Sequence, residues 1–173
     1  MVEKKQSVQG LILKYNGPFS VEDFYKEVEK WIQEKGMQKD LKRKTEDVTS
    51  KGKNIEWVIE AWKNPVRAVK QEVRMKALFN DVKEVKKKKN GKTLRFNEGK
   101  VLIDIDGWVE TSLTGRVSHV NPLYAFFRTL YDKYIWNIGT NVTEANESPV
   151  NEYCYDLHKR LKAFFELYKI KVS

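Results

Sequence analysis

A strict alternation of apolar and charged side chains over residues 69–79 constrains the fold of this chain more than any other feature of its sequence. Every second residue there is apolar apart from one glutamine, and the residues between them are mostly charged. Successive side chains of a β-strand point to opposite faces of a sheet, so this pattern predicts a strand with one face on a core and the other in water. The core-face residues are Val69, Gln71, Val73, Met75, Ala77 and Phe79.

Similar patterns predict further strands on both sides of this one. Val82 and Val85 fall out of step with the preceding alternation, which predicts a bulge or a turn at 80–85. The dipeptide Asn90-Gly91 is typical of a tight hairpin turn. The other expected strands are 7–15, 41–49, 55–62, the two arms of a hairpin over 83–96, and 100–113. Together these segments predict a curved antiparallel sheet of about seven strands.

Three helices are expected beside that sheet. The first follows the first strand, starts after the capping residue Ser20 and ends at Gly36. Two more are expected at the C-terminal end, over 122–138 and 148–170, each introduced by a proline-containing start signal and separated by the polar loop 139–147. The wide apolar stripe on 148–170 requires a packing surface, either on the fold itself or on a second copy of the chain.

This order of elements resembles the helix-grip fold of the START-like (SRPBCC) superfamily, which includes lipid-transfer and polyketide-cyclase proteins. The resemblance covers nearly all of residues 7–138 and is one of element order, without a sequence motif. It implies a single α+β domain over 1–173, in which a curved antiparallel sheet wraps around the helix 122–138 and encloses an apolar cavity, with 148–170 as an accessory helix. The stretch FFRTLYDKYIW at 126–136 is also similar to segments of uncharacterised archaeal proteins.

The resemblance implies a non-catalytic module that holds an apolar or lipid-like small molecule between the sheet and the C-terminal helix. Side chains of both elements would face one another there, and they would either line a pocket or fill a core. Gln71 interrupts the apolar face of its strand and needs an internal partner or a ligand, because an unsatisfied buried amide costs about 1–3 kcal/mol. The expected pocket residues are Trp57, Gln71, Met75, Phe79, Phe126, Phe127 and Tyr131.

No pattern of catalytic or metal-binding residues stands out, so we expect no catalytic residues, metal or cofactor, although an activity that uses scattered polar residues stays open. The nine glycines form no phosphate-binding loop. Cys154 and His158 would share a helix face, but Cys154 belongs to an apolar stripe, where cysteine acts as a small hydrophobe. Asp104 and Asp106 would share the solvent face of a strand and meet lysines of a neighbouring strand. His119 is expected in a loop.

The chain has 33 basic and 24 acidic side chains, and its net charge of +9 is concentrated in the expected hairpin. Segment 83–100 carries eight basic and two acidic side chains, a net charge of +6, and a second basic cluster lies within 39–53. Such patches attract nucleic acid or an anionic membrane surface, but lysines on an exposed strand also prevent strand pairing between molecules. The expected polyanion-binding residues are Lys83, Lys86, Lys87, Lys88, Lys89, Lys92 and Arg95.

Three functional hypotheses follow from the sequence: a module for an apolar small molecule, a basic RNA- or ribosome-associated protein, and a structural subunit that assembles through 148–170. No apolar run approaches the ~18 residues of a membrane-spanning helix, and the first ten residues lack the apolar core of a signal peptide. We therefore expect a cytoplasmic protein without a transmembrane segment.

Overall fold

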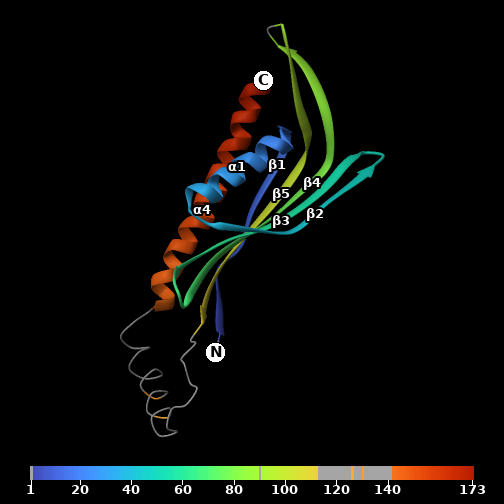
Figure 1. Cartoon of the computed structure of the whole chain (residues 1–173). Helices are drawn as coiled ribbons and strands as arrows, with labels where there is room; N and C mark the ends of the chain where they lie inside the picture. The colour runs from blue at the N-terminus through green and yellow to red at the C-terminus, as the bar shows by residue number, and fades with distance from the viewer. Residues whose placement is uncertain (1, 90, 113–125, 127–129, 131–141) are drawn as a thin grey trace.

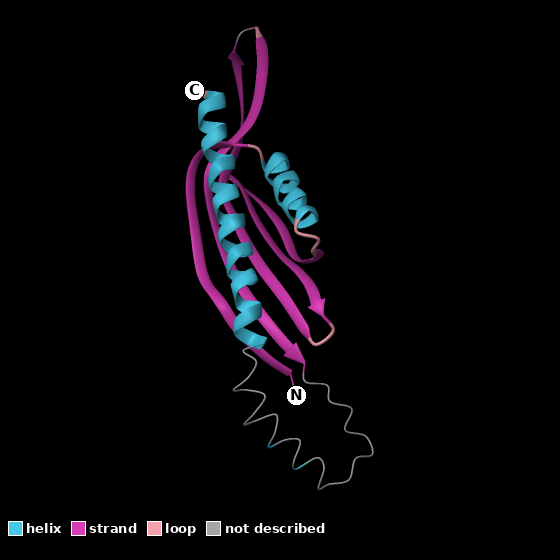
Figure 2. Cartoon of the chain, turned by 90° about the vertical axis from the view of Figure 1, so that its left-hand side faces the viewer, coloured by secondary structure: helices cyan, strands magenta, loops and turns pink. Residues whose placement is uncertain are grey.

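The computed structural model describes residues 2–89, 91–112, 126, 130 and 142–173. In this part of the chain, five strands form one antiparallel sheet, and the helices α1 and α4 lie on the same face of it (Figures 1 and 2). The long α4 runs along the sheet with the shorter α1 beside it (Figure 2). The elements are β1 (Val2–Phe19), α1 (Val21–Glu34), β2 (Gln38–Thr49), β3 (Gly52–Val66), β4 (Val69–Lys89), β5 (Lys92–Ser112) and α4 (Val142–Val172).

The strand order is β1-β5-β4-β3-β2, so β2 to β5 form a meander and β1 pairs with the free edge of β5. The expected alternation of faces on β4 is confirmed, because Met75 and Ala77 are buried whereas Arg74 is exposed. Met75 lies opposite Ile59 of β3 and Ile105 of β5, so the buried side chains of neighbouring strands form continuous rows. We call the face that carries the helices the inner face, and the opposite one the outer face.

The expected number of about seven strands is wrong, because β4 and β5 are each one strand of 21 residues. Residues 80–85 do contain an irregularity, which is a bulge between Asn80 and Lys83 and not a turn. Gly99 lies within β5, where a Cβ would come within 2.9 Å of the Asn80 backbone oxygen. Gly99 therefore permits β4 and β5 to approach closely and does not mark the end of a strand.

The expected pair of C-terminal helices is also wrong, because residues 142–172 form one continuous helix, α4, which is the one C-terminal element assigned in the described structure. It begins within the expected loop 139–147 and contains Pro149. A proline removes one helical hydrogen bond, but the packing of an apolar stripe outweighs such local preferences. The expected helix 122–138 lies outside the described residues except for Phe126 and Leu130, which are helical and exposed.

Segment 148–170 packs on the sheet of its own chain as the greater part of α4. Val150, Cys154 and Leu161 are completely buried. At Gly107 of β5, a Cβ would lie 2.7 Å from Val150 Cγ1 and 2.8 Å from Cys154 Sγ. The helix therefore rests directly on the backbone of β5, which only a residue without a side chain permits at this distance.

Helix α1 begins and ends as expected and is joined to α4 by polar contacts. The backbone N–H of Asp23 donates to Ser20 Oγ at 3.1 Å, and Gly36 follows the helix with φ 61°. The indole N–H of Trp31 donates to the Asp156 carboxylate of α4 at 2.9 Å. No helix among the described residues is both long and apolar enough to cross a membrane.

Candidate functional site

The expected ligand pocket corresponds to the core between the sheet and the helices. Its members Trp57, Gln71, Met75 and Phe79 are each at most 5% exposed. The Phe79 ring lies 5.2 Å from that of Phe24, and the Trp57 ring lies 4.5 Å from that of Tyr25, both on α1. Gln71 is buried and does not lack an interaction partner. These close contacts favour a filled core over a pocket at these residues.

The remaining members of the expected pocket are not part of this core in the described structure. Phe126 is 62% exposed, and Phe127 and Tyr131 lie outside the described residues. The structure therefore brings together four of the seven expected residues. Binding of an apolar molecule stays a prediction.

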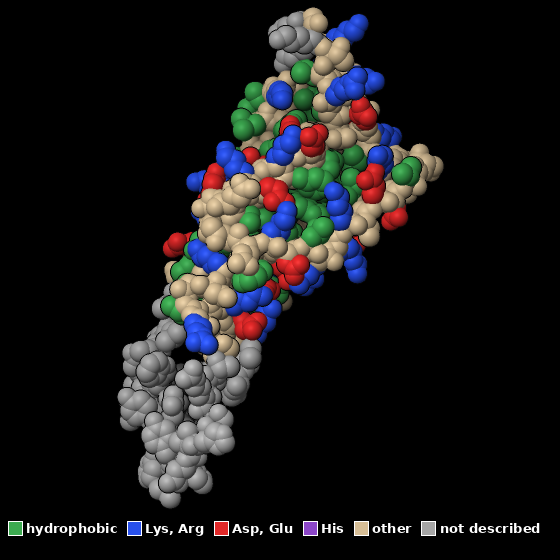
Figure 3. Space-filling view, in the orientation of Figure 1, with side chains coloured by type: hydrophobic (Ala, Val, Ile, Leu, Met, Phe, Trp, Pro, Cys, Tyr) green, Lys and Arg blue, Asp and Glu red, His purple; other side chains and the backbone are tan. Residues whose placement is uncertain are grey.

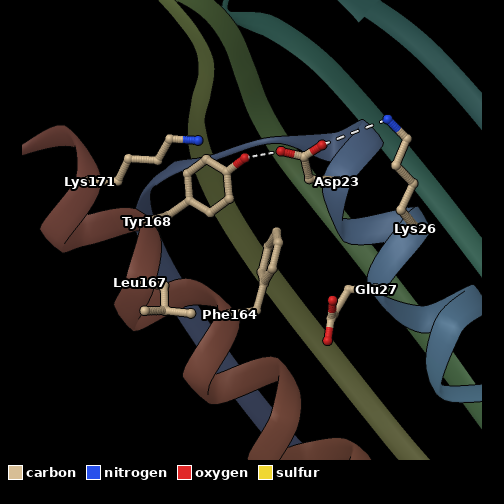
Figure 4. A pocket seen from close by; sticks show the side chains of 7 residues that line it. All are labelled: Asp23, Lys26, Glu27, Phe164, Leu167, Tyr168 and Lys171. Carbon is tan, nitrogen blue, oxygen red and sulfur yellow. Dashed lines mark hydrogen bonds and ion pairs between the residues drawn. The ribbon is translucent and has the colours of Figure 1, made fainter. Parts of the chain in front are cut away.

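A hollow of about 360 Å³ lies between α1 and α4 (Figure 4). The Tyr168 hydroxyl donates a hydrogen bond to the Asp23 carboxylate, whose other oxygen lies 4.0 Å from Lys26 Nζ. Burial, followed by the Asp23 carboxylate, raises the pKa of Tyr168 to about 12, so the hydroxyl keeps its proton at neutral pH. The hollow is a junction between two helices. Because its polar groups already bind one another, few of them are available to bind a ligand.

On the outer face of the sheet, glutamates neutralise the basic side chains around them. The pairs are Glu56 with Lys76 (3.2 Å) and Arg43 (3.4 Å), Glu60 with Lys42 (3.0 Å) and Arg74 (3.9 Å), and Glu72 with Lys70 (2.7 Å) and Lys4 (3.1 Å). Glu72 is only 4% exposed. Burial raises the pKa of Glu72, but the hydrogen bonds from Lys70 and Lys4 outweigh burial and lower it overall, so the carboxylate stays charged.

The second basic cluster, within 39–53, is paired in the same way. Lys39 bonds Glu29 of α1, and Lys53 lies 2.8 Å from Glu46. Lys44 lies over the Tyr25 ring, 4.7 Å from its centre. Lys51 is the one basic side chain of this cluster without a partner among the described residues, so the cluster is a weak candidate for binding a polyanion.

The two aspartates lie on the outer face, and neither forms a metal site. Asp106 accepts a hydrogen bond from the Gly10 backbone N–H at 2.8 Å. Asp104 lies opposite Lys76 in register, but one of its oxygens is buried without a hydrogen-bond partner among the described residues. Burial, followed by the charge of Asp106, raises the pKa of Asp104. In the described part of the chain, no group of three or more potential ligands could hold a metal ion.

The structure gives Cys154 no candidate chemistry. Cys154 is buried against β5, and burial raises the pKa of its thiol to about 12, which keeps it protonated and unreactive. This agrees with the expected role of Cys154 as a small hydrophobe. His119 lies outside the described residues.

The ends of β4 and β5 project beyond the rest of the sheet (Figures 1 and 2). Pairing of β1 with β5 ends at Asn97, and pairing of β3 with β4 ends at Val82. Residues 85–89 therefore pair only with 92–96, over a length of about 17 Å at ~3.4 Å per residue. We call these two segments the ribbon. Because an isolated two-stranded hairpin is only marginally stable in water, the ribbon lacks the support that the other strands have.

Four basic side chains of the ribbon and its base have no ion pair, unlike most of those on the outer face. No carboxylate among the described side chains lies within ion-pair distance of these four, namely Lys83, Lys86, Lys88 and Arg95, all of them exposed. Figure 3 shows this contrast on the side that it draws: blue and red side chains alternate over the body, and blue prevails towards the projecting end.

The register of the ribbon places like charges opposite each other. Lys86 lies opposite Arg95, and Lys89 lies opposite Lys92. The side chains of Lys89 and Lys92 are outside the described part of the structure. Like charges in such positions destabilise a strand pair, by an amount comparable to the ~0.2–1 kcal/mol of a favourable cross-strand pair. Lys87 is different, because it donates to the Val172 backbone oxygen at 2.7 Å and joins the ribbon to the end of α4.

A second hollow, of about 450 Å³, lies at the base of the ribbon. Four polar side chains from three strands line it, namely Lys14, Asn16, Asn80 and Lys100. Lys100 belongs to the basic segment 83–100 that is evident from the sequence, whereas no sequence pattern distinguishes the other three. Nothing in their local sequence could have identified them, because only the register of β1, β5 and β4 brings them together.

No protein-family model, curated protein or solved structure matches this chain. The resemblance to the START-like superfamily therefore stays a prediction.

Proposed function

We propose that this protein binds nucleic acid through the ribbon, by contacts to phosphate groups. The observation that carries the proposal is the contrast between two sets of cations. Most basic side chains of β2, β3 and the neighbouring part of β4, such as Lys76, Lys70 and Lys53, are paired with carboxylates, whereas Lys86, Lys88 and Arg95 on the ribbon are not. A polyanion would supply the missing negative charge and relieve the repulsion across the ribbon.

The kind of cation favours contacts to the nucleic-acid backbone. The chain has 26 lysines and seven arginines. Lysine is a compact point charge that contacts phosphates without a fixed geometry, whereas arginine presents a planar fork that binds phosphates and also reads base edges. Phosphate contacts fix position without reading sequence. The proposed binding is therefore largely independent of sequence and strongly dependent on salt.

The shape and surface of the ribbon favour nucleic acid over an anionic membrane. A two-stranded β-ribbon fits within the major groove of duplex DNA. Elements that lie in a membrane interface bury large apolar side chains in it. The exposed large hydrophobic residues of the described chain all lie outside 83–100, so the ribbon offers no such anchor.

Fluorescence anisotropy of labelled duplex DNA and single-stranded RNA, measured over a range of salt concentrations, tests the proposal. Contacts to about five phosphates predict a slope of log K against log salt of roughly −4 to −5. The variant Lys86→Gln/Lys88→Gln should make the slope on duplex DNA less steep by about 1.8, at ~0.9 for each lost contact. The matched control is Lys159→Gln/Lys162→Gln, which removes two exposed lysines of α4 and leaves the same net charge.

The control variant should bind like the unmodified protein. Equal losses in the two variants would mean that overall charge, and not the ribbon, attracts nucleic acid, and would contradict the proposal. So would an absence of binding to either probe. Binding to phosphatidylserine vesicles, with no binding to either nucleic acid, would instead assign the ribbon to a membrane surface.

A further inference from the structure

The hollow at the base of the ribbon has the features of a site for a phosphate group. Asn16 of β1 lies directly opposite Lys100 of β5, which lies directly opposite Asn80 of β4. Directly opposite residues share a face of the sheet. Lys14 lies two residues before Asn16 on β1, on the same face, and contributes a second ammonium group. Two ammonium groups and two carboxamides from three strands thus surround one hollow of about 450 Å³.

These polar side chains are almost unused by the rest of the protein. Lys14, Asn16 and Asn80 make no side-chain hydrogen bond or ion pair within the described structure. Lys100 has one charged neighbour, Asp81, at 3.9 Å. Elsewhere on the outer face, each of the three glutamates contacts two cations. Two ammonium groups and two carboxamide N–H groups with a single carboxylate neighbour form an arrangement that an anionic ligand completes.

The backbone explains why the hollow forms at this place. The β4 bulge begins at Asn80, and Asp81 has a positive φ of 56°. The Asp81 backbone N–H donates to Asn54 Oδ1 at 3.0 Å, which holds the bulge against β3. Bulges bend a strand and redirect its side chains, and they occur often beside functional sites. The hollow is therefore part of a fixed feature of the sheet.

We infer that this hollow binds a phosphate of the nucleic-acid backbone next to the segment held by the ribbon. The inference rests on the proposed function. Lys100 lies four residues from Phe96 on β5, a distance of about 14 Å at ~3.4 Å per residue. By strand alternation Arg95 lies on the opposite face from Lys100, so nucleic acid that contacts both sites crosses the exposed edge of the ribbon. Lys83, which is exposed and unpaired, lies between them along the sheet. Leu102 provides an apolar wall on which a sugar or base can rest.

The variant Lys14→Gln/Lys100→Gln tests the inference, because both lysines are exposed and their loss leaves the core intact. The salt slope on duplex DNA should become less steep by about 1.8, at ~0.9 for each lost contact. In NMR spectra of the unmodified protein, a duplex oligonucleotide should shift the side-chain amide signals of Asn16 and Asn80. The same signals should stay in place in the variant. Lys159→Gln/Lys162→Gln again serves as the control of equal charge.

The outcomes separate this inference from the proposed function. An unchanged slope together with unmoved Asn16 and Asn80 signals would overturn the inference, while a loss in the Lys86→Gln/Lys88→Gln variant would still support the ribbon. A loss in the hollow variant alone would support the hollow and contradict the ribbon. Inorganic phosphate serves as a separate probe. Signals that respond to it but not to the oligonucleotide would mean that the hollow binds a free anion, and would also overturn the inference.

Discussion

Replacing Gly107 by alanine tests how closely α4 packs on the sheet. The new Cβ would lie 2.7 Å from Val150 Cγ1 and 2.8 Å from Cys154 Sγ, whereas carbon atoms pack best at about 3.5–4.0 Å. Both neighbours are completely buried, so neither can turn into solvent. Extra atoms in a packed core cost about 1–3 kcal/mol. For a chain of this size, that lowers Tm by roughly 2–12 °C, at about 2–4 °C for each kcal/mol.

A double-mutant cycle shows whether the cost arises at the predicted contact. Val150→Ala removes the methyl group nearest to the new Cβ. Thermal and urea unfolding of both single variants and of the combined variant should give a coupling of about 0.5–3 kcal/mol, with the combination more stable than the two separate effects predict. Effects that add to within about 0.3–0.5 kcal/mol would refute the reasoning, because α4 would then not rest on Gly107.

Three further variants test other features of the structure. Tyr168→Phe removes the hydrogen bond to Asp23 between the helices and should lower the unfolding free energy by about 1 kcal/mol in urea titrations; an unchanged midpoint would contradict that bond. Asp104→Asn should raise Tm at pH 7, because burial and Asp106 raise the pKa of Asp104 and the fold therefore disfavours its charge. The gain should disappear near pH 3, where Asp104 is protonated in both states, and a lower Tm at pH 7 would mean that the charged form is stabilising. Glu72→Gln should lower Tm at pH 7, because the two lysines hold the pKa of Glu72 below its usual 4.5. The stabilisation by the charged Glu72 is present above the usual pKa and is lost as pH falls through the lowered pKa of the folded protein. A Tm difference between the variant and the unmodified protein that persists at pH 2 would contradict this explanation.

The alternation of side chains was sufficient to predict which face of β4 is buried, because a period of two follows directly from strand geometry. It was not sufficient to predict where strands end. Asn80-Asp81 and Gly99 have the composition of turns, so the sequence predicts strand boundaries there. In the structure, a bulge and a close strand contact accommodate these residues within continuous strands. Composition alone does not distinguish these cases, because glycine and asparagine suit all of them.

The sequence predicts the positive charge of the candidate site, but it does not predict which basic side chains form ion pairs with carboxylates. The lysine-rich hairpin is evident from the sequence, whereas the neutralised state of the other basic cluster is not. Glu72 is buried between Lys70, two residues away, and Lys4, which is 68 residues away and comes close only through the pairing of β1 with β5. The same limit applies to the hollow, where Asn16 and Asn80 become neighbours through the register of three strands.

Hydrogen exchange of the free protein and of its complex with duplex DNA tests the role of the ribbon most directly. The ribbon pairs only with itself, so its amides should exchange faster in the free protein than those of the supported part of β4. At saturating DNA, peptides covering 85–96 should become protected, while peptides of β3 should exchange as before. Protection of β3 or of the outer face, with no change in the ribbon, would contradict the account.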